Sequence, residues 1–457
     1  MKRGWMWALS LMFVSGVLQA TEVHEFQLDN GLKILVQEDH RAPVVVSQIW
    51  YKVGSSYEHG GITGVSHVLE HMMFKGTEKH ASGEFSRIIA LNGGRENAFT
   101  SSDYTAYFQR INKDRLGLCL ELEADRMRNL RLDATEFAKE VNVVKEERRM
   151  RTDDKPRSLT YERFKSVAYS SSPYGNPVIG WMGDLDSLTL EDAQTWYEAW
   201  YAPNNATLVV VGDVKPAEVF ALAKHHFGAL KPSKQPLIKA RAEVQQHGTQ
   251  RLTLKLPAKL PYLIMGYKTP VLKSVDEPWK AYALEVLVGI LDGGDSARFS
   301  DRLVRSRQLA ASAGASYNLH GRLDAMLVLD GIPAQDHDLD ALETALLAEV
   351  ELLKQGKISA AELNRVKAGV LASSVYERDS MFYQAMQIGI LETNGVGYRA
   401  LDQYLAGIQA VTVKQVAQVA REYLNMEQLT VARLEPLPLE TAKKPPASRA
   451  GLRGDKL

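Results

Sequence analysis

The stretch His67-Val68-Leu69-Glu70-His71 decides how the rest of the chain is interpreted. Apolar residues surround it and predict a helix that is buried on at least one side. At about 100° per residue, His67 and His71 lie one turn apart and Glu70 lies beside them. Two imidazoles one turn apart can bind one divalent metal ion, most often zinc, and the carboxylate between them can take a proton from a water at the metal.

This His-x-x-Glu-His order reverses the commoner His-Glu-x-x-His motif and is itself a signature of zinc peptidases. The alternative is a polar patch of ordinary solvated residues on a surface helix. The apolar flanks of the stretch argue against that alternative, because ionisable groups in an apolar setting usually have a partner.

Length and composition limit the classes of protein that remain. The chain has 457 residues, of which 45% are hydrophobic, which is enough for two or more domains with cores of their own. Lys and Arg number 55, as do Asp and Glu, so the net charge is zero and no basic patch indicates nucleic-acid binding. Cys119 is the only cysteine, which excludes an internal disulfide and a cysteine-rich metal site.

Residues 1–20 have the pattern of a signal peptide. Lys2 and Arg3 precede an apolar stretch, residues 5–18, that is short for a membrane span, and Ala20 is a small residue at a cleavage point. We expect cleavage after Ala20, a periplasmic protein, and no stable membrane span after cleavage. Leu18 is larger than the residue usual at its position, which leaves an uncleaved anchor as the alternative.

The remaining chain predicts an α+β fold made of two duplicated domains, each a mainly antiparallel sheet packed with helices. Asp29-Asn30-Gly31 between two apolar runs predicts a hairpin. Further predicted elements are strands at 44–53 and 207–211, a strand pair within 96–108 that turns near 101–102, and helices at 85–91, 116–127, 133–149, 189–201 and 217–227. Asp133 is the expected N-cap of the helix that follows it.

Two pairs of segments support the duplication. Residues 132–151 resemble 358–378, and residues 185–211 resemble 409–432, in the same order. The predicted boundaries are a first domain at 21–230, a linker at 231–250, a second domain at 251–436 and a disordered tail at 437–457. The helix of the second copy at 281–290 is apolar apart from Glu285, so only the first domain can bind the metal.

A catalytic zinc site needs a third protein ligand, and the residues alone leave several choices. Glu140, Glu146, Glu147 and a distant histidine such as His80 are all available. Glu140 and Glu147 are two turns apart on one predicted helix and so share a face, whereas Glu146 points about 100° away from Glu147.

Three segments together resemble the pitrilysin/insulinase family of zinc metallopeptidases. They are the 67–71 motif, the strand Asn97-Ala98-Phe99-Thr100 and the helix 140–147, and the closest likeness is to half-size bacterial members similar to mitochondrial processing peptidase. The resemblance implies one Zn²⁺ per chain held by His67, His71 and Glu147. It implies that Glu140 hydrogen-bonds a ligand histidine. It also implies that Glu70 is the general base on zinc-bound water.

The same resemblance implies a substrate and a reaction. Asn97, Ala98 and Thr100 match an edge strand that captures an extended substrate by strand addition. The expected function is therefore that of a secreted zinc metallo-endopeptidase acting on peptides or unfolded polypeptides. The alternative is a catalytically silent scaffold or assembly subunit with the same fold.

The second half departs from the family pattern at two positions. The family's substrate-holding Arg and Tyr fall on Val304 and Ala311 here. This departure predicts that another subunit supplies those groups. We therefore expect either a heterodimer with a zinc-free paralogue or a homodimer that uses other residues.

Overall fold

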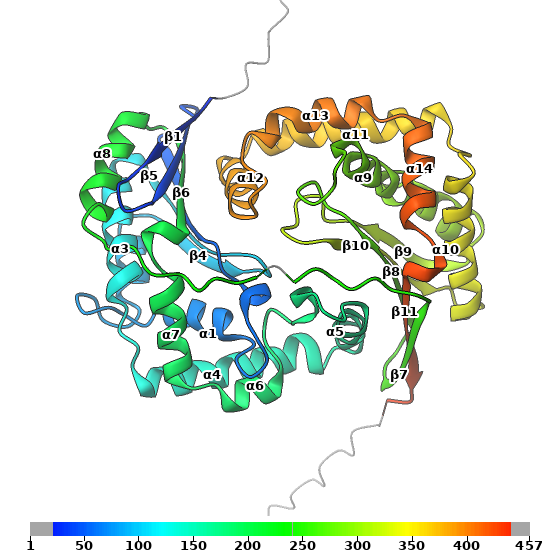
Figure 1. Cartoon of the computed structure of the whole chain (residues 1–457), viewed down its shortest axis with the longest axis horizontal. Coiled ribbons are helices and arrows are strands. Elements are labelled where there is room, and N and C mark those ends of the chain that lie inside the picture. The colour runs from blue at the N-terminus through cyan, green and yellow to red at the C-terminus, as the bar shows by residue number, and fades with distance from the viewer. Residues whose placement is uncertain (1–21, 240, 440–457) are drawn as a thin grey trace, which may run out of the picture.

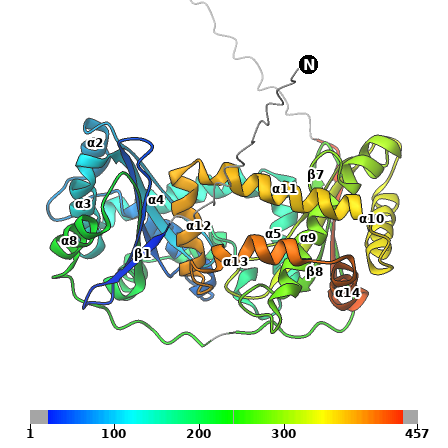
Figure 2. The same cartoon turned by 90° about the horizontal axis from the view of Figure 1, so that it is seen from above.

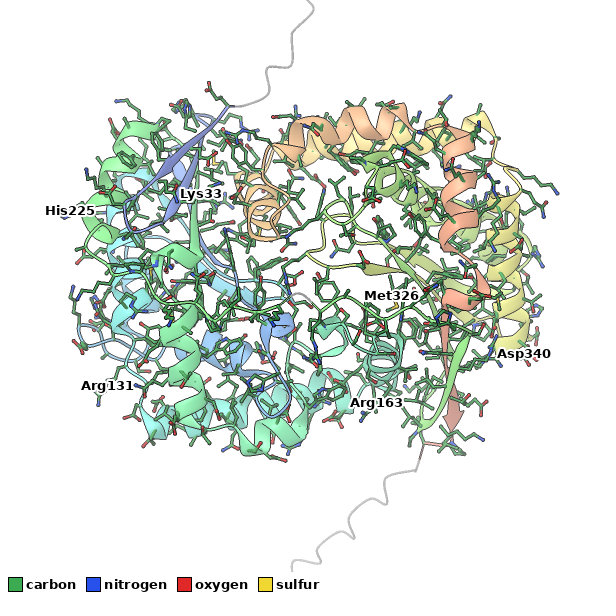
Figure 3. The ribbon with its side chains drawn as sticks, in the orientation of Figure 1. Lys33, Arg131, Arg163, His225, Met326 and Asp340 are labelled. Carbon is green, nitrogen blue, oxygen red and sulfur yellow. The ribbon has the colours of Figure 1, made fainter. Side chains whose placement is uncertain are left out.

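Two sheets with their helices lie at opposite ends of the molecule, and an extended segment joins them (Figure 1). The computed structural model describes residues 22–239 and 241–439. The predicted signal peptide and nearly all of the predicted tail lie outside these residues, although the last strand reaches Leu437. Figure 3 illustrates the separation of side chains, with Met326 towards the interior and Arg131, His225 and Asp340 at the periphery.

The first sheet has six strands, and one of its edge strands, Arg95–Thr100, forms one wall of the candidate site. Asn30 and Gly31 form the predicted hairpin turn, and Gly31 adopts a positive φ of 93°. One pair of neighbouring strands, Lys33–Glu38 and Ala206–Gly212, is parallel, and the other neighbours are antiparallel. The order across the sheet is β1 (Val23–Gln27), β2 (Lys33–Glu38), β6 (Ala206–Gly212), β3 (Val44–Tyr51), β5 (Thr105–Asn112) and β4 (Arg95–Thr100).

Eight helices belong to the described part of the first half, and all except α5 (Pro156–Ala168) contribute to the core of this sheet. They are α1 (Val65–Met72), α2 (Glu84–Leu91), α3 (Leu116–Asn129), α4 (Ala134–Arg148), α5 (Pro156–Ala168), α6 (Met182–Ser187), α7 (Leu190–Trp200) and α8 (Pro216–Phe227). A π-helical turn, η3 (Arg149–Asp153), continues α4. Asp133 caps α4 as predicted, because its carboxylate accepts hydrogen bonds from the backbone N–H groups of Thr135 and Glu136.

The second sheet repeats the order of the first without an equivalent of β1. Its strands are β7 (Gln250–Pro257), β11 (Leu429–Leu437), β8 (Tyr262–Thr269), β10 (Ala325–Pro333) and β9 (Ala310–Ser316). Again one pair, β7 with β11, is parallel and the others are antiparallel. The expected α+β class, with two mainly antiparallel sheets packed with helices, is therefore confirmed.

Most helices of the second half surround the core of the second sheet (Figure 2). They are α9 (Pro278–Asp292), α10 (Leu339–Lys354), α11 (Ala360–Arg378), α12 (Met381–Thr393), α13 (Ala400–Ala410), α14 (Val413–Tyr423) and the π-helical segment η6 (Phe299–Ser306). None of the helices within 22–239 and 241–439 is both long and apolar enough to cross a bilayer.

Two helices cross between the halves. α5 belongs to the first half by sequence, yet Phe164 and Ala168 pack on the second sheet against Ile264 and Ala432. α12 belongs to the second half, yet Ile388 packs on the first sheet. Neither crossing was predicted from the sequence, and α5 brings first-half side chains to the boundary between the sheets.

Candidate metal centre

The start of α1 is held by a buried carboxylate. Glu58 accepts hydrogen bonds from the backbone N–H groups of Gly64, at 2.7 Å, and Ser66, at 2.9 Å. These are among the N–H groups that a helix cannot satisfy by itself. Gly64 has a φ of 92°, and a Cβ there would stand 2.8 Å from the backbone oxygen of Ile179, so this entry into α1 requires glycine. These contacts fix the position of the first turn of α1, which carries His67.

The structure brings His67, His71 and Glu147 together. Nε2 of His67 lies 3.8 Å from Oε1 of Glu147, and Nε2 of His71 lies 3.6 Å from Oε2 of the same residue. One ligand atom from each of the three lies within 4.8 Å of the others. The three side chains come from α1 and α4, which are far apart in the sequence and packed against each other in the fold.

These three side chains fit a zinc ion. In tetrahedral zinc sites with bonds of about 2.0–2.2 Å, neighbouring ligand atoms stand about 3.3–3.6 Å apart, which is close to the distances above. Burial lowers the pKa of His67 to about 3, so its imidazole is neutral and able to donate a lone pair. Two imidazoles and one carboxylate also leave a fourth position open, as in catalytic zinc sites.

Glu140 orients His71. Its Oε2 lies 3.0 Å from Nδ1 of His71, and its Oε1 accepts a hydrogen bond from Lys75 at 2.7 Å. Burial alone would raise the pKa of Glu140, but the hydrogen bonds from Lys75 and His71 outweigh burial and lower it. An ionised Glu140 keeps the proton of His71 on Nδ1 and leaves Nε2 free to face Glu147.

Glu70 lies in the same cavity as the three candidate ligands. Its carboxylate accepts a hydrogen bond from the hydroxyl of Thr100, and burial raises its pKa above the ordinary glutamate value. A carboxylate with a raised pKa beside an open coordination position is suited to proton transfer near neutral pH.

Asn97, Ala98 and Thr100 lie on β4 and line this cavity. Within the part of the chain that the structure describes, β4 pairs with β5 alone and forms an edge of the first sheet. An edge strand offers a row of backbone groups to an extended polypeptide. The three residues therefore stand where strand addition would place a substrate next to Glu70.

The cavity, of about 1040 Å³, has a second wall that sequence reasoning missed. Tyr262 and Asp330 contribute from the second sheet. Arg157, Tyr161 and Lys165 contribute from α5. The spacing of four residues within this last set was a usable signal, because it places all three on one helix face.

The other candidate ligands point elsewhere. Glu146 is largely exposed and pairs with Arg149. His80 lies 3.8 Å from Glu84. Val304 lies in η6 and Ala311 in β9, and neither is among the described residues that line the metal cavity.

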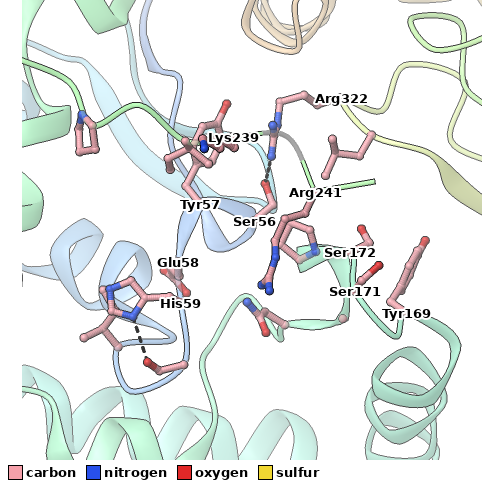
Figure 4. Close-up of a pocket in the computed structure, with 18 of the residues that line it drawn as sticks. Ser56, Tyr57, Glu58, His59, Tyr169, Ser171, Ser172, Lys239, Arg241 and Arg322 are labelled. Atoms are coloured by element: carbon pink, nitrogen blue, oxygen red, sulfur yellow. Dashed lines mark hydrogen bonds between the residues drawn. The ribbon is translucent and has the colours of Figure 1, made fainter. Parts of the chain in front are cut away.

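A separate cavity of about 790 Å³ lies beside the segment between the two sheets (Figure 4). Tyr57, Ser172 and Arg322 are among its lining residues, and Arg322 donates to the hydroxyl of Ser56. None of the candidate ligands lines this cavity, so the metal cavity is the one that matches the sequence motif.

Comparisons with known proteins agree with this arrangement. A family model described as insulinase (peptidase family M16) matches residues 33–181, and one described as the peptidase M16 inactive domain matches residues 187–370. The zinc protease PqqE of Helicobacter pylori is 34% identical over 414 residues, which cover 90% of this chain and 92% of that protein. The uncharacterized zinc protease YmxG of Bacillus subtilis is 25% identical over 91% of this chain and 98% of its own length.

Solved structures show the same fold. A crystal structure of a protease from Helicobacter pylori has a TM-score of 0.86 at 32% identity and covers 91% of this chain and all of its own. A peptidase M16 inactive domain from Pseudomonas fluorescens has a TM-score of 0.81 at 19% identity, over 92% of this chain and all of its own, and supports the fold alone. Because its relative PqqE shares more than 30% identity over nearly the full length of both chains, this protein belongs to peptidase family M16, the insulinase family.

Proposed function

We propose that this chain is a zinc metallo-endopeptidase that hydrolyses peptide bonds in peptides or unfolded polypeptides. The observation that carries the proposal is the meeting of Glu70 with His67, His71 and Glu147 in one cavity. The open edge of β4 beside them supports a polypeptide as the substrate. One zinc ion per chain is proposed, held by those two histidines and Glu147.

The protein side chains divide the remaining work. Zinc, when bound, supplies a Lewis acid that polarises a carbonyl and lowers the pKa of water. Glu70 takes a proton from the attacking water and delivers it to the leaving amine. Thr100 holds the Glu70 carboxylate by a hydrogen bond, and Glu140 holds His71. Backbone groups of β4 bind the substrate as an added strand, so recognition tolerates varied side chains.

A catalytically silent scaffold subunit is the second candidate. It is favoured by Val304 and Ala311, which stand where the resemblance implies a substrate-holding Arg and Tyr. We propose that a second subunit supplies these groups, as a zinc-free paralogue or as a second copy of this chain that uses other residues. The intact Glu70 argues for the peptidase, since a scaffold has no need of a general base.

A periplasmic location is part of the proposal and depends on residues 1–20. The basic residues and the short apolar stretch there are typical of a secretory signal.

The proposal is tested with Glu70→Gln. We expect the variant to bind one zinc per chain like the parent, because Glu70 is not among the three candidate ligands. We expect cleavage of unstructured peptides to fall by about 10²–10⁴-fold, since the general base is lost. Metal content is measured by elemental analysis and cleavage by mass spectrometry, with zinc-loaded chain.

Glu146→Gln is the matched control, because it changes a neighbouring exposed glutamate and should leave both readings unchanged. Equal cleavage by Glu70→Gln and the parent would refute the assigned base. Cleavage must be assayed with the purified chain alone and with any protein that co-purifies. Full turnover by the chain alone would refute the need for a second kind of subunit, and no turnover in either preparation would favour the scaffold.

A further inference from the structure

Three side chains of α5 form one row along the wall of the metal cavity. Arg157, Tyr161 and Lys165 are spaced four residues apart and so lie on one helix face. All three line the metal cavity. Tyr161 and Lys165 also line a neighbouring cavity of about 470 Å³, here named the side cavity. The row therefore extends from the metal centre to the side cavity.

Lys165 differs from the two arginines of the metal cavity because it has no partner. Arg157 lies 2.6 Å from Asp330, and Arg151 lies 2.6 Å from Glu147. Among the residues that the structure describes, Lys165 Nζ makes no hydrogen bond and no ion pair, and it is not one of the fully enclosed polar atoms. Its ammonium therefore faces the open space of the cavities.

The environment of Lys165 is partly dehydrated. The side chain is largely covered, and burial lowers its pKa to about 8. The amine is thus mostly protonated at neutral pH. Asp103 and Glu162 act on this ammonium only through longer-range electrostatics, and neither contacts it. A covered ammonium without a contacting counter-ion has lost hydration without gaining a hydrogen bond, so an anion that enters is stabilised more than it would be at the surface.

Among the described residues that line the side cavity, no carboxylate contacts Lys165. Asp103 lines the cavity, but this carboxylate accepts hydrogen bonds from Ser56, at 2.7 Å, and from Arg322, at 3.0 Å. Burial lowers the pKa of His320 to about 4, so that imidazole is neutral at pH 7. The rest of the described lining is mostly aromatic, hydroxyl and amide, and includes Tyr104, Tyr161, Tyr169, Tyr174, Tyr317, Asn318 and Asn394.

We propose that Lys165 and the side cavity form a subsite that binds a carboxylate of the substrate, either an acidic side chain or the carboxylate at the end of a peptide. This inference rests on the proposed peptidase function and adds a preference to it. Asp and Glu side chains and a C-terminal carboxylate all present the same acceptor to one ammonium. Alternate residues of an extended substrate point to opposite sides, and successive residues on one side stand about 6–7 Å apart. One ammonium can therefore contact the side chain at one position, and the preference should be confined to that position.

Binding can be measured apart from turnover. The zinc-loaded full chain carrying Glu70→Gln is titrated into labelled, unstructured peptides, and fluorescence anisotropy gives the affinities. One series moves a single Glu along a glutamine-rich peptide. A second compares a free with an amidated C-terminus. We expect one position of Glu, or the free C-terminus, to bind at least about tenfold tighter than its neutral counterpart.

Lys165→Met should abolish that difference, and Lys165→Arg should retain part of it. Lys155→Met is the matched control, because it removes an equal charge from the exposed residue before α5, outside both cavities. Thermal unfolding establishes that each variant is folded, and Lys165→Glu, which should favour a Lys-containing peptide, provides a second folded test.

The outcomes separate this inference from the proposed function. A preference that disappears in Lys165→Met supports the subsite, and the series in which it occurs identifies the source of the carboxylate. Equal affinities across both series, no binding, or a preference that survives Lys165→Met would overturn it. Failure of the proposed function would instead appear as absence of cleavage by the parent chain, whatever the binding results.

Discussion

A single contact decides how His71 can act at the metal centre. Glu140 contacts its Nδ1 and also Lys75, whereas Glu147 faces the Nε2 atoms of both histidines. Two glutamates on one helix thus have different tasks, and the difference comes from which imidazole nitrogen each one meets. Glu140 stabilises an orientation and a tautomer of His71 rather than occupying a ligand position.

Glu140→Ala should therefore weaken metal binding without removing it. We expect the zinc affinity to fall about 10–100-fold, which is typical when the partner of a ligand histidine is lost. Competition with a chromophoric chelator measures the affinity. Glu146→Gln on the same helix is the control and should bind zinc like the parent. An unchanged affinity in Glu140→Ala would show that Glu140 serves only to pair with Lys75.

The site residues that lie close together in the sequence could be predicted, and those that meet only in the folded chain could not. His67, Glu70 and His71 lie within five residues, so helix geometry alone places them together. The assignment of Glu147 as a ligand depended on the family resemblance. The helix face on which Glu147 lies was predictable from the sequence, but its proximity to α1 was not. Lys165 was missed entirely, since its importance depends on a cavity whose walls meet only in the folded chain.

At the scale of whole elements, α1 and α9 occupy matching positions in the two halves and have different surroundings. α1 follows β3 in the first half, and α9 follows β8, which has the matching place in the second sheet. α9 is packed on several sides by apolar residues and by helices α11, α13 and α14. Glu285 is the one ionisable carboxyl of its buried stretch 281–290, and burial raises its pKa to about 7.

This carboxyl should make the stability of the second half depend on pH. The unfolded chain ionises Glu285 near pH 4.5, whereas the folded protein holds its proton to about pH 7. Between these values the folded state binds more protons, so the free energy of unfolding falls as pH rises, by about 1–3 kcal/mol for this group. In Glu285→Gln the free energy of unfolding should lack this decrease with rising pH, and the variant should be more stable than the parent above pH 7.

Urea unfolding at pH 5 and pH 8 measures the effect. Glu121→Gln is the control, because it alters an exposed glutamate of a first-half helix and should keep the slope of the parent. A parent and a Glu285→Gln variant with the same change in unfolding free energy between the two pH values would contradict the prediction.

The elements that were predicted and missed differ in what determines them. The hairpin at Gly31 and the cap at Asp133 depend on residues adjacent in sequence, and both predictions are confirmed. α5 and α12 were not predicted. Each packs on the sheet of the other half, through Phe164 and Ile388. Sequence patterns indicate which face of a helix is apolar but not which distant sheet will cover it.

At the scale of the whole molecule, the metal cavity depends on how the two halves are held. Its walls come from both sheets, and polar contacts outside the cavity join the halves. Arg322 lies in the loop before β10, and its side chain donates to Asp103, at 3.0 Å, and to Ser56, at 2.8 Å. The hydroxyl of Tyr174 also bonds Asp103, so the carboxylate is shared between residues of both halves. Lys33 and Glu392 form a second contact across the halves at 2.7 Å.

Arg322→Ala should loosen the halves while leaving the metal ligands in place. Asp103 has a side chain that is 6% exposed, so removing Arg322 leaves a buried carboxylate without its cationic partner, and we expect a loss of about 3–5 kcal/mol in unfolding free energy. Asp103→Asn combined with Arg322→Ala should recover part of the lost unfolding free energy, because no buried charge remains.

Arg399→Ala is the control for this prediction. It breaks a pair with Glu25 that also joins the halves, but the arginine side chain of that pair is 72% exposed, so the loss of unfolding free energy should be less than about 1 kcal/mol. Denaturant unfolding gives these values, and zinc affinity, which should be unchanged, separates loosening of the halves from damage to α1 and α4. Equal stability in Arg322→Ala and Arg399→Ala would show that this contact does not hold the two halves together, and a loss of zinc binding in Arg322→Ala would show that the substitution damages α1 and α4 instead.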